Sequence, residues 1–151
     1  MKMHIGGQWV DRSEKIEVLN PFSGSIIDTI PRASQQDVET SLKTAEHGAE
    51  IMAKMTGYER YEIIHKVSEI MAERVEELAQ IITLEEGKTL AEATIEASRA
   101  IEIIALSGEE AKRLSGEVVP LDGGPGVKDK FGFTMRIPCG IVVGISPFNF
   151  P

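Results

Sequence analysis

The sequence has little of what secreted and membrane-spanning proteins need. Its 151 residues include one cysteine, Cys139, which can form no disulfide within the chain and no metal-binding cysteine pattern. A lone cysteine favours a reducing, cytoplasmic setting. Apolar residues nowhere run together for the roughly 18 positions of a membrane span. The start MKMHIGGQWV also lacks the apolar core of a signal peptide, so we expect neither secretion nor membrane insertion.

Positive charge is scarce as well. Lys and Arg total 16 against 24 Asp and Glu, a net charge of −8, whereas a protein that coats phosphates needs the opposite balance. Nucleic acid is therefore not an expected partner. Most of the acidic excess lies between residues 59 and 117, which hold 14 Glu, no Asp and 7 Lys or Arg. The composition, 42% hydrophobic and 26% charged, is otherwise that of a globular protein with the length for one domain and its core.

Two β-hairpins are expected at the start of the chain. Gly6 and Gly7 separate the short β-prone runs at 3–5 and 8–10, and a Gly-Gly spacer is a hairpin signal. A second pair of runs, at 16–19 and 25–30, flanks NPFSG, in which proline and glycine favour a reverse turn.

After Pro31 the apolar period changes from two to about 3.6, which predicts three long helices. Ser34 with Asp37, and Thr56 with Glu59, have the spacing of capping boxes at the starts of the first two. The second helix is expected over 57–85 with Gly87 ending it, and the third from Leu90 to about 114.

The tail is expected to return to β structure. Residues 117–121 and 132–138 bracket the polar, glycine-rich connection DGGPGVKDK, which indicates a hairpin. Ile141 to Ile145 is an unbroken apolar run, as in strands covered on both faces of a parallel sheet. Because SPFNFP follows this run and no helix covers it, we interpret the sequence as the front part of a longer protein.

Several features with possible chemistry favour plainer interpretations. Gly87, Lys88 and Thr89 imitate the end of a phosphate-binding loop, but the glycine required at position 82 is Ile82 and a helix is expected in front. The three histidines have no ligand spacing, so no metal site is predicted. Glu85 and Glu86 are interpreted as solvated charge. Cys139 has no His, Lys or Arg nearby in the sequence except Arg136 to activate its thiol, which argues against a nucleophile.

SPFNFP, residues 146–151, is the remaining candidate site. In open α/β sheets, ligands bind just beyond the carboxyl ends of the strands, and this segment directly follows the predicted strand 141–145. Two prolines stiffen it, and the Asn149 amide is a neutral donor that suits an oxyanion pocket. Alternatively, Asn149 caps a turn, as Asn often does in loops. The residues alone leave both interpretations open.

Several motifs in order resemble the aldehyde dehydrogenase superfamily. IGGQWVD (5–11) and NPFSG (20–24) resemble its opening hairpins, ER (59–60) and LEEGKTLAEA (84–93) its helical signatures, and RIPCGIVVGISPFNFP (136–151) its entry into the cofactor domain. The resemblance implies an α/β, aldehyde dehydrogenase-like fold of which this chain is the amino-terminal portion. Residues 1–116 would carry hairpins and helices, 117–138 an oligomerisation hairpin, and 139–151 the first strand of a Rossmann-like parallel sheet.

The resemblance also implies an activity, the oxidation of a small aldehyde with NAD or NADP through a cysteine thiohemiacetal and thioester. Asn149 matches the oxyanion-hole amide, and Ile145, Ser146, Pro147 and Phe148 match residues that line the nicotinamide and its ribose. Phe148 replaces the family's usual Trp, and Cys139 does not match the nucleophile's motif. The nucleophile and the general-base glutamate would lie beyond residue 151, so these residues alone are expected to be inactive.

The intact protein is expected to form a homodimer or homotetramer. Alternatives are a non-catalytic oligomerisation or binding module, and a specialised enzyme such as lactaldehyde or non-phosphorylating glyceraldehyde-3-phosphate dehydrogenase.

Overall fold

The computed structural model describes residues 1–151 and confirms both N-terminal hairpins. β1 (Met3–Ile5) pairs antiparallel with β2 (Gln8–Val10), and the intervening Gly6 and Gly7 both have positive φ, +58° and +80°. This backbone matches the twist of a two-residue hairpin turn. β3 (Lys15–Leu19) pairs antiparallel with β4 (Ile26–Pro31) around the NPFSG turn.

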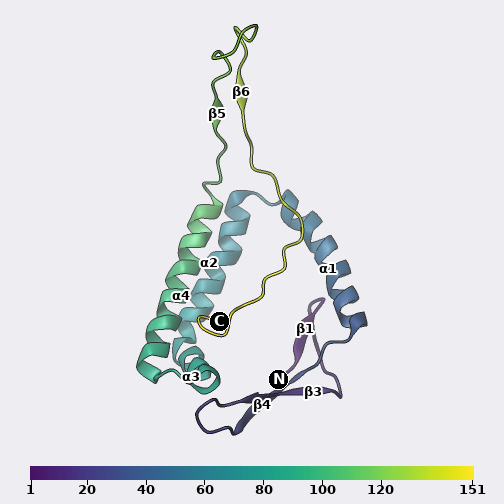
Figure 1. Ribbon diagram of the computed structural model, residues 1–151, viewed down its shortest axis with the longest axis vertical. Coiled ribbons are helices and arrows are strands. Elements are labelled where there is room, and N and C mark those ends of the chain that lie inside the picture. Colours follow the sequence, from purple (N-terminus) through teal and green to yellow (C-terminus); the bar gives the residue numbers. More distant parts are fainter.

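Four helices follow, and three of them form one packed unit (Figure 1). α2 (Gly57–Glu73) and α4 (Leu90–Ala111) lie side by side and antiparallel, and α3 (Val75–Glu86) packs against α4. α1 (Gln35–Lys54) stands apart from them, and the C-terminal segment runs through the space between. A Cβ on Gly57 would lie 2.8 Å from the carbonyl oxygen of Ala111, so glycine lets α2 begin close to the end of α4.

The prediction of a single helix over 57–85 is wrong, because the helix breaks at Arg74. The backbone of Arg74 has φ −117° and ψ 16°, outside the helical range, and it joins α2 to α3. α3 leaves the direction of α2 and packs against α4. We therefore attribute the break at Arg74 to tertiary packing and not to local helix propensity. Neither glycine nor proline marks it in the sequence.

The chain buries little apolar surface within itself. The buried hydrophobic residues are the alanines Ala79, Ala93 and Ala97, and 8 of 151 residues are buried in all. Small side chains let α3 and α4 approach closely, but they enclose little apolar volume. Large apolar side chains on every helix stay exposed, among them Val38, Ile63, Ile81, Ile103 and Leu106. So many exposed large apolar side chains are unusual for a protein surface that faces only water.

The tail has less β structure than expected. β5 (Val118–Val119) and β6 (Gly132–Phe133) form a short antiparallel ladder in a hairpin that projects beyond the helices (Figure 1). Residues 141–145, predicted as a strand, form none. A strand requires hydrogen bonds to a neighbour, and no strand of the chain pairs with this segment, although β1 lies close to it. The side chains of Val142 and Val143 are accordingly exposed.

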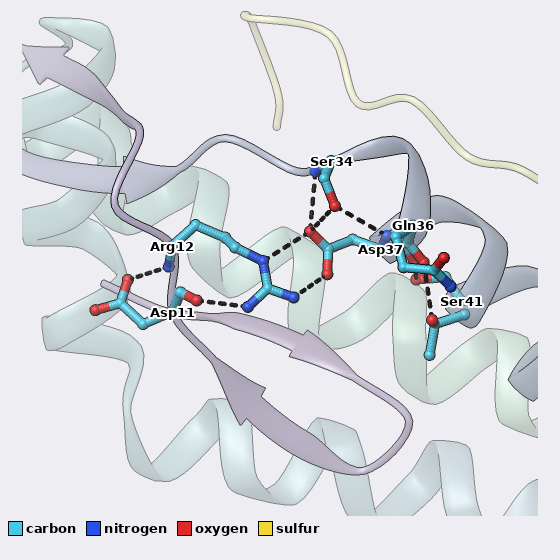
Figure 2. Close-up of polar contacts among 7 residues, drawn as sticks. Asp11, Arg12, Ser34, Gln36, Asp37 and Ser41 are labelled. Atoms are coloured by element: carbon cyan, nitrogen blue, oxygen red, sulfur yellow. Dashed lines mark hydrogen bonds and ion pairs between the residues drawn. The ribbon is translucent and has the colours of Figure 1, made fainter.

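An ion pair fastens the start of α1 to the link between β2 and β3 (Figure 2). The Arg12 guanidinium donates to both carboxylate oxygens of Asp37, with Nε 3.0 Å from Oδ2. Ser34 completes the predicted capping box, because its N–H donates to the Asp37 carboxylate at 2.9 Å and its Oγ accepts the Asp37 N–H at 3.2 Å. The Ser34 hydroxyl also donates to that carboxylate at 2.7 Å. Arg12 first, and then Ser34, hold the pKa of Asp37 well below its ordinary value of 3.8.

None of the helices is both long enough and apolar enough to cross a lipid bilayer.

Candidate functional site

The candidate residues 145–149 lie on the exposed C-terminal segment, which ends beside α4 and the end of α3 (Figure 1). Ile145 and Phe148 expose 91% and 69% of their surface. The segment is tied to the helices by the residue that follows Asn149. The backbone N–H of Phe150 donates a hydrogen bond of 3.1 Å to Oε1 of Glu86, at the end of α3.

The Asn149 amide has no hydrogen-bond partner within the chain. The contrast with Asn20 is informative, because the Asn20 side chain accepts hydrogen bonds from the N–H groups of Phe22 and Ser23 at 2.9 and 3.0 Å. Asn20 therefore caps a turn, and Asn149 does not. The structure therefore contains no turn capped by the Asn149 side chain, and the role of this amide as an oxyanion donor stays a prediction.

Phe150 is held in an unusual backbone conformation. Its φ is +60°, in the left-handed region that costs a residue with a Cβ on the order of 1–2 kcal/mol. Lys88 Nζ lies 4.2 Å from the centre of the Phe150 ring, a cation–π contact. The bond to Glu86 and this contact with Lys88 both act on Phe150, the residue next to Asn149.

The group that holds Phe150 is a three-residue charge cluster of Glu86, Lys88 and Glu96. Lys88 Nζ lies 2.9 Å from Oε2 of Glu86 and 2.5 Å from Oε2 of Glu96. The side chains of Glu86, Glu96 and Lys88 expose 4%, 10% and 23% of their surface. Glu96 first, and then Glu86, raise the pKa of Lys88 above its ordinary value against the opposing effect of burial. The interpretation of Glu86 as solvated charge is therefore wrong.

The turn between α3 and α4 places this cluster. Gly87 ends α3 with φ +83°, as predicted, and Thr89 begins α4 with a capping box to Glu92. Gly87, Lys88 and Thr89 are thus a C-cap, a turn residue and an N-cap, and no strand precedes them. This geometry confirms that they form no phosphate-binding loop.

Beside the cluster, Phe150 and Pro151 line one edge of an open groove of about 420 Å³ on α4. Its other walls come from Glu96, Arg99, Ala100, Ile103 and Ile104. Cys139 lies exposed on the segment before the candidate residues. Groups of three or more His, Cys, Asp or Glu side chains with a metal-binding arrangement are absent.

Comparison with known proteins decides the family. The sequence model of the aldehyde dehydrogenase family matches residues 9–151. The chain belongs to that family. It is 36% identical to a 3-sulfolactaldehyde dehydrogenase of Priestia aryabhattai over 149 residues, which are 99% of this chain and 31% of the relative. It is equally identical, over the same shares, to a lactaldehyde dehydrogenase of Methanocaldococcus jannaschii.

Solved aldehyde dehydrogenase structures share the fold. The crystal structure of an NADP-dependent enzyme of E. coli matches with a TM-score of 0.87 and 33% identity, over 97% of this chain and 30% of that one. The match confirms the aldehyde dehydrogenase-like fold expected from the motifs. The chain spans about a third of the length of these relatives.

Reasoning from the sequence missed the charge cluster. Glu86 and Phe150 are 64 residues apart, and no local period or spacing links them. The available signal was the LEEGK run itself, whose acidic and basic side chains meet at a glycine turn between two helices.

Proposed function

We propose that this chain is the amino-terminal part of an NAD(P)-dependent aldehyde dehydrogenase and that Asn149 supplies its oxyanion-hole amide. The proposed role of Asn149 rests on one observation. The Asn149 side chain is a donor without a partner, on a segment held in place by the next residue. An amide held ready, with no bond to break first, is what stabilisation of a developing negative charge requires.

The proposed chemistry begins when a cysteine thiolate outside residues 1–151 attacks the aldehyde carbon. The carbonyl oxygen gains negative charge as the carbon–sulfur bond forms. Asn149 Nδ2–H donates a hydrogen bond to this oxygen and keeps the thiohemiacetal in the geometry for oxidation. The amide is neutral and does not titrate near pH 7, so its contribution is independent of pH.

Residues 145–148 would hold the nicotinamide end of the cofactor. Ile145 and Phe148 present exposed apolar surface, which fits contact with a flat ring, and Ser146 adds a hydroxyl group. Bound NAD or NADP supplies the acceptor for the hydride that leaves the substrate carbon. The E. coli structure is of an NADP-dependent enzyme, but the residues that separate NAD from NADP are expected after position 151.

The exposed apolar segment supports the expected division of the chain. A run of apolar residues without partners, at 141–145, fits a central strand of a Rossmann-like sheet whose neighbours come from further protein. We therefore assign residues 1–116 to the hairpins and helices, 117–138 to an oligomerisation hairpin and 139–151 to the start of the cofactor domain. The intact protein would be a cytoplasmic homodimer or homotetramer.

A short 2-hydroxy aldehyde is the substrate class we propose to test first. The two relatives are named for sulfolactaldehyde and lactaldehyde, and both compounds carry a hydroxyl next to the aldehyde carbon. The test is a panel of lactaldehyde, sulfolactaldehyde, malonate semialdehyde and simple alkanals with the intact protein. We expect formation of NADH or NADPH with at least one of them. Reduction of neither cofactor with any aldehyde would contradict the proposed activity and favour a non-catalytic module.

A further inference from the structure

We propose that the cluster of Glu86, Lys88 and Glu96 positions the oxyanion-hole amide by fixing the Asn149–Phe150 peptide. The three residues are positioning residues, since none of them touches the Asn149 side chain in the structure. This inference rests on the proposed role of Asn149.

The Glu86 carboxylate contacts two partners, one through each oxygen. One oxygen, Oε1, accepts the Phe150 N–H at 3.1 Å. The other, Oε2, is buried without a hydrogen bond and lies 2.9 Å from Lys88 Nζ in an ion pair. A carboxylate held at one oxygen by a cation presents the other in a fixed direction. Because Glu86 is 4% exposed, water competes little for either oxygen.

The contact of Glu86 with Phe150 also constrains the peptide bond between Asn149 and Phe150. The bond between Asn149 and Phe150 is planar, so a fixed Phe150 N–H also fixes the plane of the Asn149 carbonyl. Lys88 holds the other end of Phe150 through its ring. The left-handed φ of +60° at Phe150 is one that an unheld phenylalanine would rarely keep. Release of either contact should let Asn149 move.

Glu96 contacts Lys88 from a second helix. Lys88 sits between two carboxylates from different helices, Glu86 at the end of α3 and Glu96 on α4. Glu96 therefore sets where Lys88 lies, and it ties the position of Phe150 to the packing of α3 on α4. An ion cluster that served only to join the two helices would not need the Phe150 contacts.

A double-mutant cycle in the intact enzyme tests this inference. We expect Glu86→Ala to lower kcat on the order of 10- to 100-fold, the scale of a small misplacement of a reacting group, with little change in the KM for cofactor. In an Asn149→Ala background the same change should cost almost nothing. Glu77→Ala is the matched control, because Glu77 lies on the same helix and forms an exposed pair with Arg74 at 2.6 Å. It should leave kcat unchanged.

Two further measurements separate positioning from loss of stability. Glu86→Gln keeps an acceptor oxygen for Phe150 and should recover part of kcat, and hydrogen exchange of the Phe150 amide should be fast in Glu86→Ala and slow in the parent enzyme. An equal loss of kcat from Glu86→Ala with and without Asn149, or an exchange rate unchanged by Glu86→Ala, would overturn the positioning role. Failure of the proposed function has a different result, an unchanged kcat in Asn149→Ala alone.

Discussion

Gly87 lies directly against Pro21, because a Cβ added at Gly87 would lie 3.0 Å from Cγ of Pro21. Pro21 belongs to the NPFSG turn, and Gly87 ends α3 with φ +83°. The glycine thus serves two purposes, a left-handed helix cap and a close approach to the proline ring. It also holds the turn that carries Lys88.

The first prediction concerns this glycine. Gly87→Ala should lower the free energy of unfolding by about 1–2 kcal/mol, because alanine is strained at this φ and its methyl group meets Pro21. Gly48→Ala is the matched control, since Gly48 lies within α1 and a Cβ there meets nothing within 4 Å. Chemical denaturation measures the free energy of unfolding of both variants and of the parent. A Gly87→Ala variant as stable as the parent would show that the turn relaxes freely.

The second prediction concerns the start of α4. Thr89→Ala should destabilise the protein by about 1 kcal/mol, because it removes the side chain that accepts the Glu92 N–H. Thr94→Ala, in the same helix, removes a hydroxyl that bonds only the Leu90 carbonyl, and should be neutral or slightly stabilising. Thermal melts of the two variants compare them, and equal shifts in Tm would contradict the capping role.

The third prediction concerns acid stability. The folded-state pKa of Asp37 lies below its ordinary value of 3.8, so its ion pair contributes stability above about pH 4 that is lost as pH falls toward the lowered pKa. Arg12→Ala removes the main cause of the lowered pKa. The variant should therefore lose less stability than the parent between pH 4 and pH 2, while being less stable at pH 7. Denaturation midpoints across this range are the measurement, and parallel pH profiles would contradict it.

The fourth prediction concerns the projecting hairpin. Phe131 and Phe133 expose 73% and 61% of their surface, and their ring centres are 6.0 Å apart. If residues 117–138 join subunits, Phe131→Ser with Phe133→Ser should shift the intact protein to a smaller assembly in light scattering. Phe22→Ser is the control, because Phe22 in the NPFSG turn is 95% exposed, more than either hairpin phenylalanine, and it should leave the assembly unchanged. The same mass for all three proteins would exclude the hairpin from the interface.

Local chemistry made much of the fold predictable. Capping residues at Ser34 and Thr56, the glycine pair at 6–7 and the glycine at 87 each fix their own backbone, and all lie where predicted. The break at Arg74 and the missing strand at 141–145 depend on distant partners. The first follows from packing on α4, and the second requires hydrogen bonds to a neighbouring strand, which residues 141–145 do not form.

The candidate site divides in the same way. The motif containing Asn149 could be found from the sequence, because its residues are adjacent and resemble a family pattern. The contact of Glu86 with Phe150 joins positions 64 residues apart, so it depends on how the chain folds back past α3. The salt bridge between Lys88 and Glu96 joins the turn after α3 to α4, and no local sequence pattern predicts it.

The most direct test is the kcat of Asn149→Ala in the intact enzyme at saturating aldehyde and cofactor. We predict a loss on the order of 10²–10³-fold, about 3 kcal/mol of transition-state stabilisation. Asn20→Ala is the control, because Asn20 uses its side chain to cap a turn and should affect stability but not kcat. A near-normal kcat in Asn149→Ala would contradict the role of this amide as the oxyanion donor.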